Sequence, residues 1–162
     1  MSRKFALTGV CIAAAAIVLA APAYAATTTT TMAVSATVQA TCSASAGALA
    51  FGTYTGSQVD GAASLSVSCT STTPYTVSLN PGTGTGATVA VRKMTSGANT
   101  LSYTLYSDSG RTTLWGQTIG TDTVAGTGNG SAQAISVYGR VIAGQLPVPA
   151  LYSDTVTATI TY

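Results

Sequence analysis

The side chains that most often carry acid–base or metal chemistry are scarce in this sequence. It contains no histidine, and its four acidic residues are all aspartates, at positions 60, 108, 122 and 154. Ser-His and Cys-His dyads and histidine-ligated metals are therefore excluded, and the isolated aspartates show no paired-carboxylate spacing. Two glycine runs, GTGTG at 82–86 and GTGNG at 126–130, lack the Lys-Ser/Thr and the helix that follow a phosphate-binding loop. We predict that the protein is not an enzyme, holds no metal or cofactor and has no small-molecule substrate.

Residues 1–25 have the pattern of a secretory signal peptide. Two basic residues at positions 3 and 4 precede the apolar run FALTGVCIAAAAIVLAA, and the small-x-small motif AYA ends at Ala25. We expect cleavage between Ala25 and Ala26 and export of the remaining chain. The competing interpretation of the apolar run is a membrane-spanning helix.

Cleavage changes both the charge and the cysteine count. It removes two of the six basic residues, so four basic and four acidic residues remain and the formal net charge falls from +2 to zero. A neutral chain with scattered charges lacks the clustered cations that nucleic acids and anionic membranes attract. Cys11 leaves with the signal, and Cys42 and Cys69 remain. In an exported protein this pair favours one disulfide over free or metal-binding thiols.

The sequence consists largely of short runs of alternating apolar and polar residues. These runs must form the elements that position the aspartates and cysteines. β-branched and aromatic residues favour strands, and Gly, Pro, Asn and Asp cluster between the runs, where the chain must turn. No stretch has a convincing helical period. Many short strands at close spacing predict an all-β sandwich or barrel. We expect strands at 48–54, 64–69, 75–80, 88–93, 101–106, 113–117, 134–141 and 152–162.

The N-terminal part of the chain suggests an extra strand, and the C-terminal part suggests that a strand is missing. The run TTTTTMAVSATV at 27–38 alternates with a period of two, which is typical of a half-buried strand. The sequence stops inside its last expected strand, without the seventh strand that would close an immunoglobulin-like sandwich. An apolar groove and an unpaired edge would then lie open. The extra strand could fill that groove within one molecule or between molecules. Alternatively, it is the ordinary first strand of a complete domain.

Three segments of the sequence resemble the spore coat protein U domain, which is also the fold of major subunits of archaic chaperone–usher pili. They are YTLYSDSGRTTLWG at 103–116, YGRVIAGQLPVPALYSDTVTATITY at 138–162, and VSATVQATC followed by LAFGTY in the N-terminal half. The resemblance covers essentially all of the mature chain. The threonine tract at 27–31 departs from the family pattern, and 80–100 is the least diagnostic region.

The resemblance implies an incomplete immunoglobulin-like β-sandwich that is completed by an N-terminal donor strand. The implied organisation is a signal peptide at 1–25, a donor segment at 26–38 and the β-sandwich domain at 39–162. Strand addition places alternate side chains in pockets of the acceptor. The side chains expected to face inward on the donor segment are Met32, Val34, Ala36 and Val38. Those expected on the acceptor edge are Val156, Ala158, Ile160 and Tyr162.

The function that this resemblance implies is that of a structural pilus subunit. Such a subunit polymerises by donor-strand exchange into a surface fibre for adhesion and biofilm formation. Its partners would be further copies of itself, a periplasmic chaperone and an outer-membrane usher, and it would pass through the periplasm to the cell surface. Two alternatives are a secreted spore-coat or matrix protein and a small secreted carbohydrate-binding module that uses exposed Tyr and Trp. We expect Trp115 and the tyrosines to serve mainly in packing.

Overall fold

A computed structural model describes residues 22–162 of the chain. Its compact unit is Thr37–Tyr162, and the residues up to Ala36 form a unit of their own. Residues 22–41 contain no helix or strand. Most of the predicted signal peptide lies outside the described residues. Within the described part, no helix is long and apolar enough to cross a membrane.

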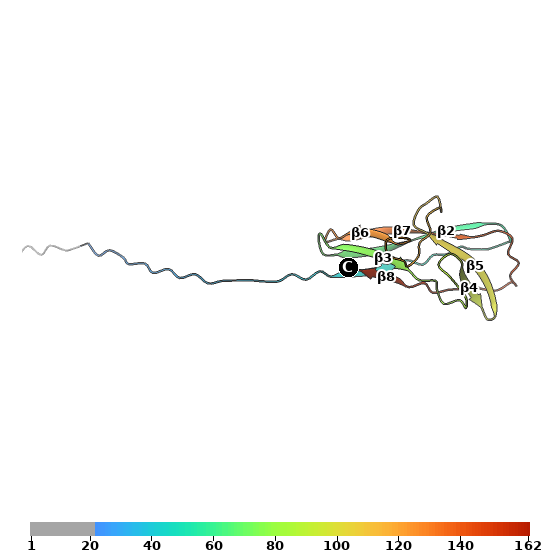
Figure 1. The fold of residues 1–162 in the computed structure, drawn as a ribbon, viewed down its shortest axis with the longest axis horizontal. Coiled ribbons are helices and arrows are strands. Elements are labelled where there is room, and N and C mark those ends of the chain that lie inside the picture. The colour runs from blue at the N-terminus through green and yellow to red at the C-terminus, as the bar shows by residue number, and fades with distance from the viewer. Residues whose placement is uncertain (1–21) are drawn as a thin grey trace, which may run out of the picture. The chain divides into compact units, whose positions relative to one another are not determined.

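Eight strands in the described part form two sheets (Figure 1). All six ladders between strands are antiparallel. The larger sheet has the order β1 (Cys42–Ala46), β2 (Val59–Cys69), β7 (Ala132–Val141), β5 (Asn99–Tyr106) and β4 (Arg92–Ser96). The smaller sheet has the order β6 (Val124–Thr127), β3 (Pro74–Leu79) and β8 (Ala158–Thr161). The fold is therefore the all-β, immunoglobulin-like sandwich that the sequence predicts.

Alternation along the strands places one face of each sheet in a shared core. Removing one such Val or Leu side chain from water stabilises the fold by about 1.5–3 kcal/mol. Trp115, from the loop after β5, is fully buried, and its indole Nε1 donates a hydrogen bond of 3.0 Å to the carbonyl of Val77. The buried side chains on the central strands are Leu65 and Val67 of β2, Tyr75, Val77 and Leu79 of β3, Leu101, Tyr103 and Leu105 of β5, and Val137 and Val141 of β7.

The strand boundaries differ from the sequence prediction at several places. Residues 48–54 form no strand, because the chain leaves the edge of β2 after the Gly47 N–H bonds the carbonyl of Ser64. Residues 88–91 form a turn, so β4 begins only at Arg92. The expected strand at 113–117 is a single bridge between Tyr106 and Leu114. The expected last strand is paired over 158–161 and by a single bridge between Ser153 and Thr95, while β1 and β6 are additional strands.

The predicted disulfide joins Cys42 and Cys69, which lie directly opposite each other on β1 and β2. It marks one end of the domain, which we call the disulfide end. At the other end of β2, Val59 pairs with Val141, and the loop 142–151 follows. We call this the loop end; Figure 1 shows the β4–β5 hairpin on this side of the domain, away from the C-terminus.

Candidate functional site: an open apolar groove

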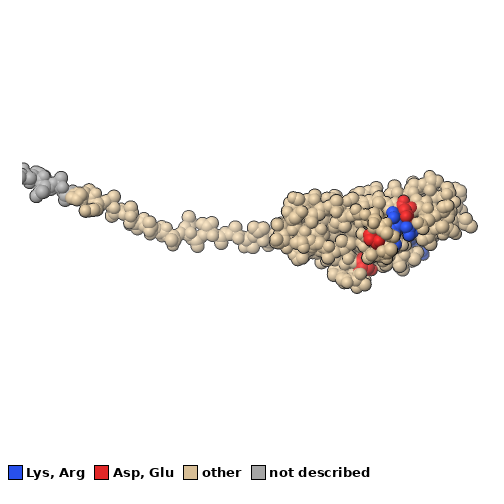
Figure 2. All heavy atoms as spheres, turned by 90° about the horizontal axis from the view of Figure 1, so that it is seen from above, with Lys and Arg blue, Asp and Glu red and all other residues tan. Residues whose placement is uncertain are grey.

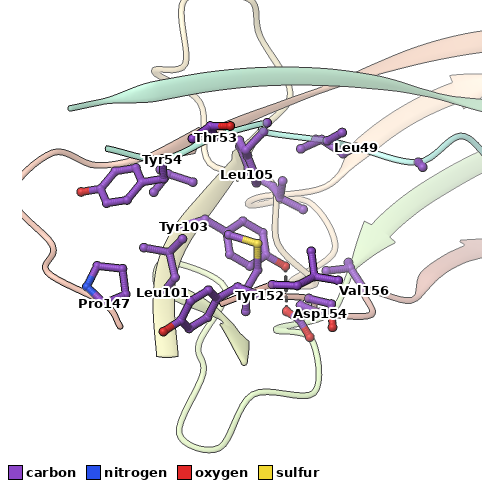
Figure 3. Close-up of a pocket in the computed structure, with 18 of the residues that line it drawn as sticks. Leu49, Thr53, Tyr54, Leu101, Tyr103, Leu105, Pro147, Tyr152, Asp154 and Val156 are labelled. Atoms are coloured by element: carbon purple, nitrogen blue, oxygen red, sulfur yellow. Dashed lines mark hydrogen bonds between the residues drawn. The ribbon is translucent and has the colours of Figure 1, made fainter. Parts of the chain in front are cut away.

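An open groove of about 1070 Å³ lies between residues 46–56 and residues 145–156. Its floor is the inner face of the larger sheet. Figure 3 shows Leu101, Tyr103 and Leu105 of β5 on this floor, with Leu49 and Tyr54 on one side and Tyr152 and Val156 on the other. Most of the lining side chains are apolar, so the groove is suited to an apolar occupant.

One wall of the groove exists because two glycines let the chain cross the sheet. Gly61 of β2 and Gly139 of β7 are paired, and Leu49 and Phe51 pack over them. A Cβ on Gly139 would lie 2.7 Å from Cζ of Phe51. The ring of Phe51 also meets Tyr103 edge-on, with centroids 5.7 Å apart. Residues 47–56 are thereby held against the sheet without forming a strand.

A smaller cavity of about 140 Å³ continues the groove between β1 and β8. It is lined by Ala44, Ala46 and Leu65 on one side and by Ala158 and Ile160 on the other. The two cavities share Ala46 and Leu65. In the described part of the chain, β1 pairs only with β2 and β8 pairs only with β3. Each strand therefore has a free edge, and a free edge offers unpaired N–H and C=O groups to an added strand.

The predicted acceptor residues are distributed along this groove. Val156 lines the large cavity, and Ala158 and Ile160 line the small one. Tyr162 lines neither cavity, and 59% of its surface is exposed. Among the predicted donor residues, Met32, Val34 and Val38 are between 84% and 88% exposed. Their assignment as donor and acceptor residues remains a prediction.

Asp154 is the one charged residue among the described residues that line the groove. Its carboxylate accepts hydrogen bonds from the N–H and hydroxyl of Thr83, both 2.8 Å. It also accepts one from the Tyr103 hydroxyl at 2.7 Å, which Figure 3 shows as a dashed line. Burial alone would raise the pKa of Asp154, but these hydrogen bonds hold it below its ordinary value of 3.8. Burial, and then the bond to Asp154, raises the pKa of Tyr103 above its usual range. The group ties the last segment of the chain to β5 and to the loop after β3.

Arg92 is a second buried charge, and among the described residues 22–162 it has no carboxylate partner within salt-bridge distance. Its guanidinium donates to four backbone carbonyls, those of Leu79, Asn80, Val89 and Trp115, at 2.8–3.0 Å. Burial lowers the pKa of this guanidinium. Arg92 thus satisfies carbonyls at the ends of several segments, which is a structural role rather than a binding one.

The remaining charged side chains lie outside the groove. Asp60 accepts hydrogen bonds from Arg140 at 2.8 and 3.0 Å and lies 3.4 Å from Arg111. Figure 2 shows charged side chains of both signs close together on one part of the domain, while most of the visible surface is uncharged. No group of three or more His, Cys, Asp and Glu side chains in the described part could hold a metal ion.

Sequence reasoning missed two parts of the groove. Leu49 and Phe51 were placed in a strand, yet they turn inward as a wall; the nearby Gly61 and the distant Gly139 were the available signal. Gln145 carries no signal in the sequence that sets it apart, yet its side chain bonds the backbone of Ser102 in both directions. The prediction that Trp115 packs in the core is confirmed, because the side chain is fully buried. It therefore offers no exposed platform for a sugar.

The fold and the groove define the class of protein to which the chain belongs. It is an immunoglobulin-like β-sandwich with an open groove between two strand edges. The profile of the Spore Coat Protein U domain matches residues 28–159, and the chain belongs to this family. It is 40% identical over 128 residues to Protein U of Myxococcus xanthus, covering 70% of this chain and 71% of that protein.

A solved structure has the same fold. It is a chain in the crystal structure of the CsuC–CsuE chaperone–tip adhesion subunit pre-assembly complex from archaic chaperone–usher Csu pili of Acinetobacter baumannii. The TM-score is 0.60 at 23% identity. The match covers 78% of the present chain, which spans 41% of the solved one. At this identity the likeness establishes the fold.

Proposed function

We propose that this protein is a structural subunit of a chaperone–usher pilus and polymerises by donor-strand exchange. The observation that carries the proposal is the groove, where an apolar floor lies between the free edges of β1 and β8. A strand added there gains backbone hydrogen bonds from an edge, and its alternate side chains enter pockets. The fold shared with a chain of the Csu pilus complex supports the same assignment.

The donor in this proposal is residues 27–38 of a second copy. Met32, Val34, Ala36 and Val38 lie on one face when this segment is extended. Each Val or Met moved from water into the groove contributes about 1.5–3 kcal/mol to the complex. The acceptor side is β8 with Val156 and, opposite to it, β1. A periplasmic chaperone would fill the groove before assembly, and an outer-membrane usher would guide the exchange. The fibre would serve adhesion and biofilm formation at the cell surface.

The test compares the mature chain with a variant that lacks residues 26–38. The mature chain should form ladders that resist SDS at room temperature and dissociate on boiling. The shortened variant should remain unpolymerised and should gain thermal stability when a synthetic peptide of residues 27–38 is added. A peptide with the same composition in scrambled order is the control. Two stable monomers with equal melting temperatures would overturn the proposal.

A secreted coat protein is the second candidate. It is favoured by the 40% identity to Protein U and by the name of the family. Electron microscopy of the secreted material separates the two candidates, because a pilus subunit forms thin fibres whereas a coat protein forms an amorphous layer on cells.

A further inference from the structure

The loop 142–151 carries a concentration of exposed apolar side chains. Leu146 is 95% exposed and Leu151 is 88% exposed, while Ile142 and Val148 are each about half exposed, at 52% and 51%. None of the loop residues is charged. Leu146, Val148 and Leu151 also line the large groove, so the loop borders the site proposed for the donor strand. A cluster of this kind on a small domain marks a surface that contacts something else.

Hydrogen bonds hold this loop in one shape. The side-chain amide of Gln145 accepts from the N–H of Ser102 at 2.7 Å and donates to its carbonyl at 2.9 Å. The Tyr54 hydroxyl donates to the carbonyl of Ile142 at 2.9 Å and accepts from the N–H of Gln145 at 3.0 Å. A surface that is already ordered loses little entropy when it binds. The exposed leucines therefore lie on a loop that is held in one conformation by hydrogen bonds.

We propose that loop 142–151 is the contact surface for a second copy of this chain, whose disulfide end covers Leu146 and Leu151. The inference rests on the proposed function, because it uses the direction of the donated strand. Every ladder in the domain is antiparallel, so a strand that extends the small sheet in the same manner runs opposite to β8. The last residue of the donor segment, Val38, then lies at the loop end of the groove.

The short connection between donor segment and domain determines what lies beside the loop. Only residues 39–41 separate Val38 from Cys42. The four residue steps from Val38 to Cys42 reach at most about 13–14 Å. The disulfide end of the donor copy must therefore lie next to the loop end of the acceptor copy. A chaperone or a foreign surface would have to compete with a domain that is tethered in place.

Tyr162 gives the disulfide end an apolar partner for the loop. Thr161 pairs with Thr76 at the beginning of β3, and the Thr70–Thr73 turn that leads into β3 bonds Thr41 next to the disulfide. Tyr162 thus lies at this end, is 59% exposed and takes no part in either cavity. A tyrosine ring is well suited to cover leucine side chains at a contact. We therefore place Tyr162 of one copy against Leu146 and Leu151 of the next.

Cysteine cross-linking of the full mature chain tests this contact. The variant Leu146→Cys with Tyr162→Cys should give polymers that, after boiling without reductant, still run as a covalent ladder, and the ladder should disappear with reductant. The two positions lie at opposite ends of β2, whose 11 residues span about 35 Å, so a bond within one chain is excluded. Ile119→Cys with Tyr162→Cys is the matched control, because Ile119 is 61% exposed in another loop. This control should give no ladder.

The variant Tyr162→Ser separates the contact from the strand exchange, because Tyr162 lines neither cavity. It should keep the SDS-resistant polymer, and its fibres should bend more, which appears as a shorter persistence length in electron micrographs. Ile119→Ser should leave the fibres unchanged. Polymers of the cysteine variant without a covalent ladder would overturn this inference and leave the proposed function intact. Loss of polymer in the Tyr162→Ser variant would place Tyr162 in the strand exchange itself and overturn the contact. A wild-type chain that never polymerises would overturn both proposals.

Discussion

Asp154 shows how one residue links the groove to the stability of the domain. Its pKa lies below the ordinary value because Thr83 and Tyr103 donate hydrogen bonds to the ionised carboxylate. A carboxylate with a lowered pKa stabilises the folded state fully above the unfolded pKa, near 4. That contribution is lost as the pH falls through the folded value. Asp154→Asn should therefore lower the free energy of unfolding by about 1–3 kcal/mol at pH 7, and the difference from wild type should shrink below pH 4.

Urea unfolding at a series of pH values measures this effect. Tyr103→Phe is the companion variant, because it removes one donor to Asp154 and keeps the buried ring; its cost at pH 7 should be smaller, about 0.5–1.5 kcal/mol. Parallel pH profiles for the wild type and Asp154→Asn would show that the carboxylate is not the source of the acid sensitivity.

Such residue-level features were only partly accessible from the sequence. The disulfide followed from export and from the count of two remaining cysteines. The roles of Asp154 and Arg92 did not follow, because their partners are backbone groups or side chains from segments far apart along the chain. Arg92 bonds carbonyls 3 to 23 residues away. No spacing rule connects such positions before the fold is known.

Among the elements, segment 47–56 depends on two glycines in the sheet beneath it. A Cβ on Gly139 would lie 2.7 and 2.9 Å from two carbons of the Phe51 ring. Gly139→Ala should therefore lower the free energy of unfolding by about 1–3 kcal/mol, because the ring must move or the sheet must shift. Phe51→Leu shortens the ring side chain, so the double variant should recover part of this loss.

A double-mutant cycle from urea unfolding measures this coupling. The two single variants and the double variant give an interaction energy that should be clearly favourable. Strict additivity of the two changes would show that Phe51 is not the group displaced by the new methyl. Alanine normally suits a strand better than glycine, so a stabilised Gly139→Ala variant would also contradict the prediction.

The prediction of elements was correct where alternation and burial agreed. The runs at 64–69, 75–80, 101–106 and 134–141 all fall within or next to strands of the core. It was wrong at 48–54, where an apolar alternation serves a segment that crosses the sheet instead of pairing with it. At 152–162 the alternation is real, yet only β8 forms a ladder and Ser153 makes a single bridge to Thr95, because the segment between them lines the groove. A period of two indicates which face of a strand is apolar. It does not indicate which other strand pairs with it.

For the whole molecule, the proposed assembly makes opposite predictions for neighbouring residues of the donor segment. Val34 and Ser35 lie on opposite faces of an extended chain. Val34→Asp would place a charge in the apolar groove, so the SDS-resistant ladder should be lost. Ser35→Asp adds the same charge on the outer face and should leave the ladder intact. Equal behaviour of the two variants on SDS gels would contradict an inserted donor strand.

The position of the disulfide has a consequence for mechanics. A pull on the chain before Cys42 would, without the bond, load the five residue pairs of the β1–β2 ladder. The disulfide lies at the first of these five pairs, so the tension passes directly to β2. From β2 it spreads over ten residue pairs to β7, which are loaded along their length rather than from one end. A single covalent bond thereby transfers the load from a ladder of five residue pairs to one of ten, and the resistance of each subunit to stretching depends on its redox state.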